Sequence, residues 1–460
     1  MNIAILGSGP GGYVAAVRAS QLNAAVTVIE ANLIGGTCLN WGCIPTKTLA
    51  SSSELFAKAK KSADYGIDIT GTITPNFPKM LLRKDRIVGM QAQGIRNLFK
   101  KRGITLKEGR GEIVSPSEIS VITKNRFHET VRADRIIVAT GSRPREIPGL
   151  PFDGRRILST DDVFRMDAIP ESIVIIGAGV SGCEFACIFR QFGSEVTLLE
   201  KLPHALPGED TEISELFERE IKKRGIRFYA GVTVCNAIAD AGGIRVLLSD
   251  DREIRAEKAI VAAGRAFNSD GIGAAKLGIA KSAAGAITVN ERMETNVSGI
   301  YAVGDVIGGR LLAHVASAEG LVAAVNCTGG DERIDYSAVP EAIFTTPEIA
   351  SVGLREQNAA EMGIRIRTGH FQFRSLAKSH IIGEIDGMIK VISDKNTDRV
   401  LGTHIIGPHA SDLIHEAVLA ISNGLRTADI ARAMHAHPTL SEVMQEAAAD
   451  VHGQAIHSVR

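Results

Sequence analysis

Several features that define other classes of protein are scarce or absent in this chain of 460 residues. Lys and Arg together number 52, as do Asp and Glu, so the chain lacks the basic excess that binds nucleic acids and anionic membranes. No run of about 18 uncharged apolar residues occurs, so no transmembrane helix is expected. The apolar start of the chain lacks the basic segment and the cleavage site of a signal peptide. We therefore expect a cytoplasmic protein that binds neither nucleic acid nor membrane.

Cysteine is also scarce, because six residues are too few for a disulfide scaffold of this length. Cys38 and Cys43 lie in GGTCLNWGCIPTK (35–47), and the four residues between them can loop so that the two sulfur atoms meet. Pro45 suits the first turn of a helix, which places Cys43 near a helix N-terminus, where a thiolate is stabilised. A redox pair is favoured, and metal binding is the alternative, although no other Cys or His occurs in residues 1–127. The remaining cysteines are predicted to be buried and inert: Cys183, Cys187, Cys235 and Cys327.

What the chain does have is an internal repeat. Residues 3–30 and 173–200 align without a gap at an offset of 170 and share ten identities in 28 positions. Each copy contains a β-branched run, a glycine turn, a helical stretch, a second β-branched run and a final Glu. This order of elements predicts two βαβ units.

Each βαβ unit carries a dinucleotide-binding fingerprint, G-x-G-x-x-G, with an acid eighteen residues after its last glycine. The glycines allow a tight turn and a close approach to a pyrophosphate, and the acid binds the adenosine ribose. Two such units predict two dinucleotides, a flavin and a nicotinamide. Glu200 is an acid where the 2′-phosphate of NADP needs a cation, so NAD is favoured. The fingerprint residues are Gly7, Gly9, Gly12 and Glu30 in the first unit, and Gly177, Gly179, Gly182 and Glu200 in the second.

The pattern changes after about residue 336. Strand-like runs come first, and two helical stretches follow at Ser411–Asn423 and Thr439–Ala449. No glycine fingerprint occurs there, so this part is predicted to be an α+β domain that binds no nucleotide.

The segment GGTCLNWGCIPTK resembles the redox-disulfide segment of the pyridine nucleotide–disulfide oxidoreductases. Further segments of that family follow in the family's order: ATGSRP (139–144), TNVSGIYAVGD (295–305), LLAHVASAEG (311–320), FTTPEIASVG (344–353) and HAHPTLSE (435–442). The resemblance implies an α/β fold with two Rossmann-like dinucleotide-binding domains and a C-terminal α+β dimerisation domain. It implies an FAD-binding domain in two parts, residues 1–147 and 270–335, an NAD-binding domain at 148–269 and a dimerisation domain at 336–460.

The resemblance also implies roles for single residues. Lys47 is expected beside the flavin, paired with Glu184, and Asp305 is expected on the ribityl chain. Val180 is expected at the gate of the nicotinamide pocket, where glutathione reductases usually carry Tyr. The remaining cofactor-binding positions that match family segments are Thr37, Gly111, Thr140, Gly141, Ser142, Leu311, Leu312, Ala313, His314, Val234 and Gly264.

His437 and Glu442 match the family's catalytic dyad, and Pro438 is predicted to start the helix that carries Glu442. His435 is predicted to be structural. The C-terminal segments are most similar to family members that oxidise dihydrolipoamide with NAD through FAD and a Cys38–Cys43 disulfide. This similarity implies a homodimer whose partner is dihydrolipoamide or a lipoyl domain of a 2-oxo acid dehydrogenase or glycine cleavage complex. Two alternatives are another NAD(P)H-dependent disulfide reductase of the family and a redox-silent flavoprotein scaffold.

Overall fold

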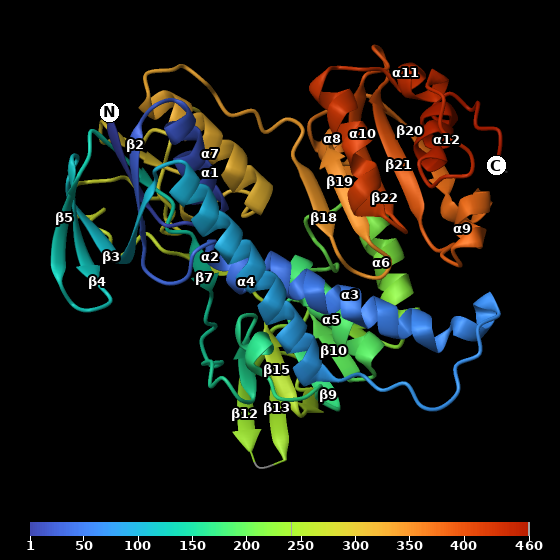
Figure 1. The fold of residues 1–460 in the computed structure, drawn as a ribbon. Coiled ribbons are helices and arrows are strands. Elements are labelled where there is room, and N and C mark those ends of the chain that lie inside the picture. Colours follow the sequence, from blue (N-terminus) through green and yellow to red (C-terminus); the bar gives the residue numbers. More distant parts are fainter. Residues whose placement is uncertain (241, 459–460) are drawn as a thin grey trace.

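The computed structural model describes residues 1–240 and 242–458, which fold around three main β-sheets (Figure 1). Two of the sheets have parallel strands at their centres, and the third is antiparallel. This confirms the predicted fold class, with two Rossmann-like domains followed by an α+β domain. None of the helices in the described ranges is long and apolar enough to cross a membrane.

The first sheet is buried on both faces. Ile3 and Ile5 of strand β1 (Asn2–Leu6) face a core shared with helices α1 (Pro10–Gln21) and α7 (Ala313–Cys327), and Ala4 and Leu6 face the opposite core. Such two-sided burial is typical of parallel strands between covering layers. The strand order is β17 (Ile300–Ala302), β6 (Arg135–Val138), β1 (Asn2–Leu6), β2 (Ala25–Glu30), β3 (Thr105–Ser115), β4 (Glu118–Thr123) and β5 (His128–Arg132), of which β4 and β5 are antiparallel.

Helices α1 and α7 pack closely against each other although they come from opposite ends of the first 330 residues (Figure 1). A Cβ atom at Gly320 of α7 would lie 2.4 Å from the carbonyl oxygen of Gly11 in α1, so glycine is needed at this crossing. The helices of this domain are α1 (Pro10–Gln21), α2 (Gly36–Asn40), α3 (Cys43–Lys60), η1 (Ser62–Tyr65), α4 (Phe77–Lys101), η3 (Gly304–Ile307) and α7 (Ala313–Cys327).

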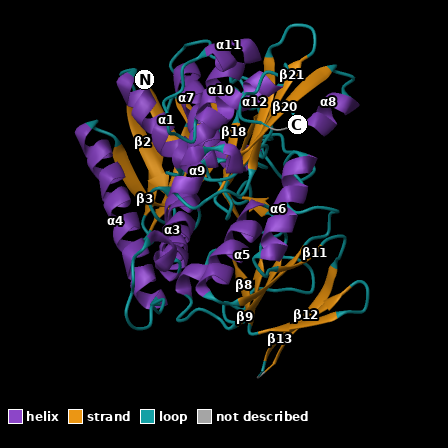
Figure 2. Ribbon diagram, turned by 90° about the vertical axis from the view of Figure 1, so that its right-hand side faces the viewer, coloured by secondary structure: helices purple, strands orange, loops and turns teal. Residues whose placement is uncertain are grey.

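The second sheet belongs to the inserted domain. It has five parallel strands in the order β11 (Arg227–Tyr229), β10 (Glu195–Leu199), β9 (Ser172–Ile176), β15 (Lys258–Val261) and β8 (Ile157–Ser159). Its helices are α5 (Val180–Phe192), α6 (Thr211–Lys223) and η2 (Asp162–Arg165). A separate antiparallel sheet, whose β12–β13 hairpin projects from the domain in Figures 1 and 2, contains β12 (Val234–Asp240), β13 (Gly243–Leu248) and β14 (Glu253–Ala256). Strands β7 (Ser142–Pro144) and β16 (Arg265–Phe267) pair where the chain enters and leaves this domain.

The third sheet is antiparallel, in the order β18 (Pro340–Ile343), β19 (Ile349–Gly353), β22 (Val400–Ile406), β21 (Met388–Asp394) and β20 (Ile366–Gln372). Its helices are α8 (Glu356–Glu361), η4 (Phe373–Ser375), α9 (Ala377–Ile381), α10 (Ala410–Ser422), α11 (Thr427–Arg432) and α12 (Glu442–Asp450). The prediction that Pro438 starts the last helix is wrong. Helix α12 begins at Glu442, because the Glu442 carboxylate accepts the Thr439 N–H and closes a turn before the helix.

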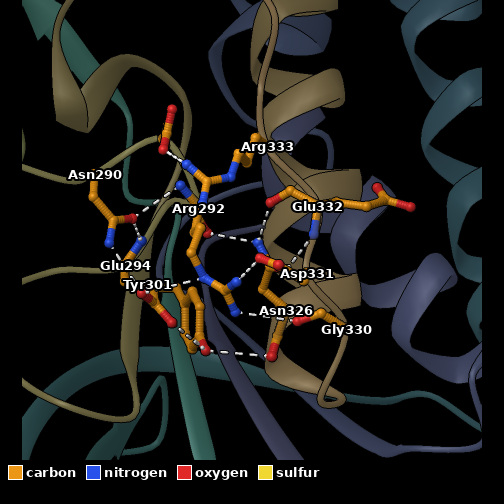
Figure 3. Close-up of polar contacts among 10 residues, drawn as sticks. Asn290, Arg292, Glu294, Tyr301, Asn326, Gly330, Asp331, Glu332 and Arg333 are labelled. Carbon is orange, nitrogen blue, oxygen red and sulfur yellow. Dashed lines mark hydrogen bonds and ion pairs between the residues drawn. The ribbon is translucent and has the colours of Figure 1, made fainter.

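A polar network holds the end of α7 against the loop that precedes β17 (Figure 3). The Asn326 side-chain amide donates to the carbonyl oxygens of Arg292 and Glu332, at 3.0 and 2.8 Å. The Arg292 guanidinium donates to the carbonyl oxygen of Gly330 at 3.1 Å and pairs with Asp331. These bonds fix the point at which the chain leaves the first domain for the third.

A buried ion cluster joins the second domain to the third. The Lys390 ammonium, only 2% exposed, lies 2.9 Å from the carboxylate of Asp210, which caps helix α6. It also lies 3.1 Å from Glu212 of α6 and 2.5 Å from Glu356 of α8. Burial opposes the charge of Lys390, but its hydrogen bonds to Glu356 and Asp210 outweigh that effect and raise the pKa of the lysine. The cluster therefore fixes the orientation of α6 against the third sheet.

Candidate active site

The first glycine loop follows β1 and opens α1. Gly7 has φ +103°, and a Cβ atom there would lie 2.2 Å from the Ala139 carbonyl oxygen. A Cβ atom at Gly12 would lie 2.0 Å from the Gly7 carbonyl oxygen. Both positions therefore require glycine. Gly9 is the N-cap of α1, and no side chain caps the helix, so its first N–H groups are available to an anion.

The second loop repeats this geometry after β9. Gly177 has φ +103°, and a Cβ atom there would lie 2.7 Å from the Ala262 carbonyl oxygen. A Cβ atom at Gly182 would lie 1.8 Å from the Gly177 carbonyl oxygen. Gly179 caps α5 without a side-chain bond, and no described atom lies within 4 Å of a Cβ atom placed there. The loop therefore leaves open space in front of the helix N-terminus.

The two acids at the ends of β2 and β10 are held in the same way. The Ser8 N–H donates to Glu30 at 2.8 Å, and the Ala178 N–H donates to Glu200 at 2.7 Å. Each acid also accepts a second backbone N–H, from Asn32 in the first unit and Leu202 in the second. Both carboxylates are buried, yet each keeps lone pairs for a further donor such as a ribose hydroxyl. The loops and acids thus fit two dinucleotides.

Ser142 and Asp305, which the sequence assigns to cofactor binding, lie in contact. The Ser142 hydroxyl donates to Asp305 and accepts a bond of 2.6 Å from the Arg265 guanidinium. Arg265 also lies 3.6 Å from the Asp305 carboxylate. Arg265 was not predicted as a site residue, and its position directly after Gly264, a predicted cofactor-binding residue, is the signal that could have indicated it. Together these residues hold one Asp305 oxygen in place.

The other predicted cofactor residues occupy several elements. The Thr37 hydroxyl of α2 is 3.5 Å from the Ser142 carbonyl oxygen, and the Thr140 hydroxyl donates to Asn268. Gly111 lies in β3, where a Cβ atom would crowd three core side chains at 3.2 to 3.3 Å. Leu311, Leu312, Ala313 and His314 lead into α7, Gly141 and Gly264 have positive φ, and Val180 and Val234 begin α5 and β12.

Cys38 lies in α2 and Cys43 is the first residue of α3. Both thiols are reduced, and they are hydrogen-bonded to each other. The hydrogen bond from Cys38 lowers the pKa of Cys43 to about 7 against the effect of burial, and the Lys47 charge lowers it further. The same bond, together with burial, raises the pKa of Cys38. Cys43 is thus the thiol that ionises first.

Lys47 and Glu184 form an ion pair beside this thiol. The Lys47 ammonium lies 2.8 and 2.9 Å from the two Glu184 oxygens, and Glu184 is only 3% exposed. The Phe344 N–H also donates to Glu184 at 3.0 Å, and the Lys47 ammonium lies 4.8 Å from the centre of the Phe344 ring. Phe344 was not predicted as a site residue, because it contributes a backbone N–H that its residue type does not reveal. Elements from all three domains therefore hold the pair.

His437 Nδ1 donates to Glu442 at 2.9 Å, and the His437 ring is 71% exposed. Burial opposes ionisation of Glu442, but hydrogen bonds from His437 and Thr439 outweigh it and lower the pKa of Glu442. The side chain of His435 is only 7% exposed, and its Nε2 atom donates to Glu416 at 3.2 Å. His435 therefore also has a carboxylate partner, which comes from α10 rather than from its own turn.

The structure does not join every predicted site residue. Within the described part of one chain, His437 shares no hydrogen bond or ion pair with either Cys38 or Cys43. In Figure 1, helix α12, which follows His437 in the chain, lies well apart from helix α2, which contains Cys38. The prediction that Cys235 is buried is wrong, because it lies on the open face of β12 and is exposed. Cys183, Cys187 and Cys327 are buried, and burial raises the pKa of each thiol.

Two family descriptions match the chain. Residues 1–320 match the pyridine nucleotide-disulphide oxidoreductases, and residues 339–448 match the dimerisation domain of the same family. Among sequence relatives, the chain is 39% identical to the mitochondrial dihydrolipoyl dehydrogenase of Pisum sativum, over 99% of this chain and 92% of the relative. It is 41% identical to the dihydrolipoyl dehydrogenase of Bacillus subtilis, over 99% of both chains.

Two further similarities extend this picture. A leghemoglobin reductase of Glycine max is 39% identical over 97% of this chain and 87% of its own. The solved structure of LpdA from Mycobacterium tuberculosis superposes with a TM-score of 0.92 and is 29% identical, covering 97% of this chain and 99% of its own. The chain is therefore aligned with these proteins through all three of its sheets.

Proposed function

Because this chain belongs to the pyridine nucleotide-disulphide oxidoreductase family, and is thus a flavoprotein disulfide oxidoreductase, we propose that it oxidises dihydrolipoamide with NAD⁺. The observation that carries the proposal is the Cys38–Cys43 thiol pair, in which one thiol has its pKa lowered to about 7. A thiol with such a pKa is a good leaving group and a stable thiolate at neutral pH. Relatives named dihydrolipoyl dehydrogenase support the choice of substrate.

The disulfide form of the Cys38–Cys43 pair accepts two electrons from the substrate. One substrate thiolate attacks Cys38 Sγ in the Cys38–Cys43 disulfide, the S–S bond breaks, and Cys43 leaves as a thiolate. The second substrate thiolate attacks the sulfur of its own molecule that is bound to Cys38, which releases the cyclic disulfide and a Cys38 thiolate. The two protons pass to a base and to Cys38, so the cysteines end as the reduced pair.

The base is His437, with its Nε2 atom facing the substrate. Glu442 accepts the Nδ1 proton, which fixes the tautomer and stabilises the imidazolium formed during the reaction. The matched dimerisation domain supports a homodimer, and in our proposal the exposed His437 serves the thiol pair of the partner subunit. Each active site is therefore shared between two chains.

FAD and NAD⁺ are assigned to the first and second glycine loops. A bound flavin would supply the two-electron carrier between the reduced cysteines and NAD⁺. The α1 N-terminus and Glu30 would hold the flavin nucleotide, and the Lys47 ammonium, paired with Glu184, would lie beside the flavin. Glu200 at the second loop selects NAD⁺, because a carboxylate repels the 2′-phosphate of NADP⁺.

Anaerobic stopped-flow reduction of the holoenzyme tests the proposal. We expect dihydrolipoamide and NADH each to reduce the flavin within one turnover. Cys38→Ser should abolish reduction by dihydrolipoamide and leave the first hydride transfer from NADH, whereas Cys235→Ser, at an exposed cysteine outside the site, should change neither. Reduction by NADH alone in the wild type would refute dihydrolipoamide as substrate and favour another disulfide reductase. Failure of both reductants would indicate a redox-silent scaffold.

A further inference from the structure

Helices α3 and α5 are joined by a second polar contact, away from the cysteines. Helix α3, which begins at Cys43, lies along helix α5 of the second domain (Figure 1). The Lys47–Glu184 ion pair joins the two helices near their N-termini. About two turns further along both helices, the Ser53 hydroxyl lies 2.6 Å from Gln191 Oε1. The two contacts occur in the same order along both helices, so the helices run in the same direction.

The side chain of Gln191 also bonds to the third domain. Its Nε2 atom donates to the Thr346 hydroxyl at 3.0 Å, in the segment between β18 and β19. The Phe344 N–H of the same segment donates to Glu184 at 3.0 Å. Glu184 and Gln191 lie seven residues apart, which is about two turns, so they share one face of α5. That face therefore holds both α3 and the third domain.

The contact between Ser53 and Gln191 fixes the alignment of the two helices more sharply than the apolar packing around it. Ser53 is fully buried, and one turn further along α3 the ring of Phe56 lies beside that of Phe192, with ring centres 6.3 Å apart. Apolar contacts are non-directional and tolerate a small shift along a helix. A hydrogen bond weakens steeply once its distance and angle change. Gln191 therefore supplies a directional restraint at this end of the interface.

The alignment of α3 on α5 affects the charges beside Cys43. Any shift between the helices lengthens the Lys47–Glu184 contact of 2.8 Å, which is at the optimum for an ion pair. A Lys47 ammonium released from Glu184 can turn toward Cys43, which lies four residues earlier on the same helix. The charge of Lys47 lowers the pKa of Cys43, and the charge of Glu184 raises it. A loss of alignment should therefore lower the pKa of Cys43.

We propose that Gln191 is a positioning residue for the redox helix α3. Its bonds to Ser53 and Thr346 hold α3 and the third domain in one register on α5. This register keeps Lys47 paired with Glu184 beside the thiol pair. The inference deepens the proposed function and rests on it, because it concerns the thiols that the proposed reaction uses.

The rate of iodoacetamide alkylation of Cys43 against pH tests the proposal in the reduced holoenzyme, with peptide mass spectrometry to locate the modified residue. Gln191→Met removes the bond and leaves the Ser53 hydroxyl a second acceptor, the Ala50 carbonyl oxygen at 2.9 Å. Gln191→Met and Ser53→Ala should each lower the pKa of Cys43 from about 7 by about 0.5 units, since the charge of Glu184 is displaced rather than removed. Alkylation at pH 6 should then be about 2.6-fold faster. Ser52→Ala is the matched control, because the Ser52 hydroxyl bonds to the Thr48 carbonyl oxygen of its own helix, and it should leave the pKa of Cys43 unchanged.

The sign of the shift separates a lost register from a general loosening of α3. Local unfolding would bring Cys43 toward the pKa of a free cysteine, about 8.5, and would slow alkylation at pH 6. The double variant Gln191→Met/Ser53→Ala should shift the pKa no further than Gln191→Met alone, because both changes remove the same bond between the helices. The proposal is overturned if the pKa of Cys43 rises or stays at the wild-type value, if Ser52→Ala lowers it equally, or if the two single shifts add. The assay contains neither dihydrolipoamide nor NAD⁺, so its result does not depend on whether these are the substrates.

Discussion

The charge pair next to Cys43 leads to a prediction with opposite signs for its two members. The positive charge of Lys47 lowers the pKa of Cys43, and the negative charge of Glu184 raises it. Lys47→Met should therefore raise the pKa of Cys43 above its value of about 7, and Glu184→Gln should lower it. The pKa of a thiol determines the pH above which its thiolate predominates, so the two variants should shift the reactive pH range in opposite directions.

The expected size of each shift follows from the geometry. A charge within about 4–6 Å changes a pKa by about 1–3 units, and one unit corresponds to about 1.4 kcal/mol. Lys47 has the larger influence of the two, so we expect a rise of about two units in Lys47→Met and a fall of about one unit in Glu184→Gln. The opposite charges lie within 2.9 Å of each other, so at Cys43 they partly cancel. The double variant should therefore lie only slightly above the wild type.

The assay is the rate of iodoacetamide alkylation of Cys43 in the reduced enzyme, followed against pH by peptide mass spectrometry. Lys58→Met is the matched control, because Lys58 lies on the same helix in an exposed ion pair with Glu384. It should leave the pKa of Cys43 unchanged and alter stability by less than about 1 kcal/mol. Lys47→Met leaves Glu184 buried and unpaired, at a cost of up to about 3–5 kcal/mol, so retained flavin must be verified. Shifts of the same sign in both single variants would refute the reasoning.

Three further predictions concern the cofactor, the domain contact and the dimer. Glu200→Ala should narrow the preference for NAD⁺ over NADP⁺, measured as the ratio of kcat/KM values; equal values already in the wild type would contradict the role of this acid. Lys390→Met should lower the free energy of unfolding by about 3–5 kcal/mol, because it leaves the buried Asp210 carboxylate without its cation. The control Lys276→Met removes an exposed ion pair with Glu112 and should lower the free energy of unfolding by less than about 1 kcal/mol in the same denaturation series. Cys38→Ser and His437→Gln homodimers should each be nearly inactive, and refolding the two together should restore about one quarter of wild-type activity, since about half of the dimers are mixed and each holds one intact site. No recovery would mean that each chain supplies its own histidine.

The sequence predicted the parts of the fold that depend on local patterns. The repeat at an offset of 170 located both βαβ units, because strand periodicity and glycine turns are encoded within about 30 residues. Helix α10 begins within one residue of its predicted start, since its apolar pattern is regular. The start of α12 was predicted four residues too early, at Pro438, because the Glu442 carboxylate accepts the Thr439 N–H and closes the preceding turn. The exact domain boundaries stay a prediction.

The candidate site was predictable only where residue type carries the chemistry. Cysteines, glycines and paired acids can be recognised in a sequence, and so can a His and a Glu five residues apart. Arg265 and the Phe344 N–H could not be recognised in this way, because each acts through a contact with a residue more than 100 positions away. The Lys390 cluster was missed for the same reason, since its carboxylates come from α6 and α8.

The position of β17 also determines the order in which the chain can fold during synthesis. Strand β6 ends at residue 138, but the strand that covers its edge, β17, starts at residue 300. At a synthesis rate of about 5–20 residues per second, these roughly 160 residues take on the order of ten seconds to emerge. The second sheet, whose strands all lie between residues 157 and 261, can close within that interval. The first domain is thus the last of the two to be completed, and during that time its open β6 edge is a site for chaperone binding or for mispairing with another chain.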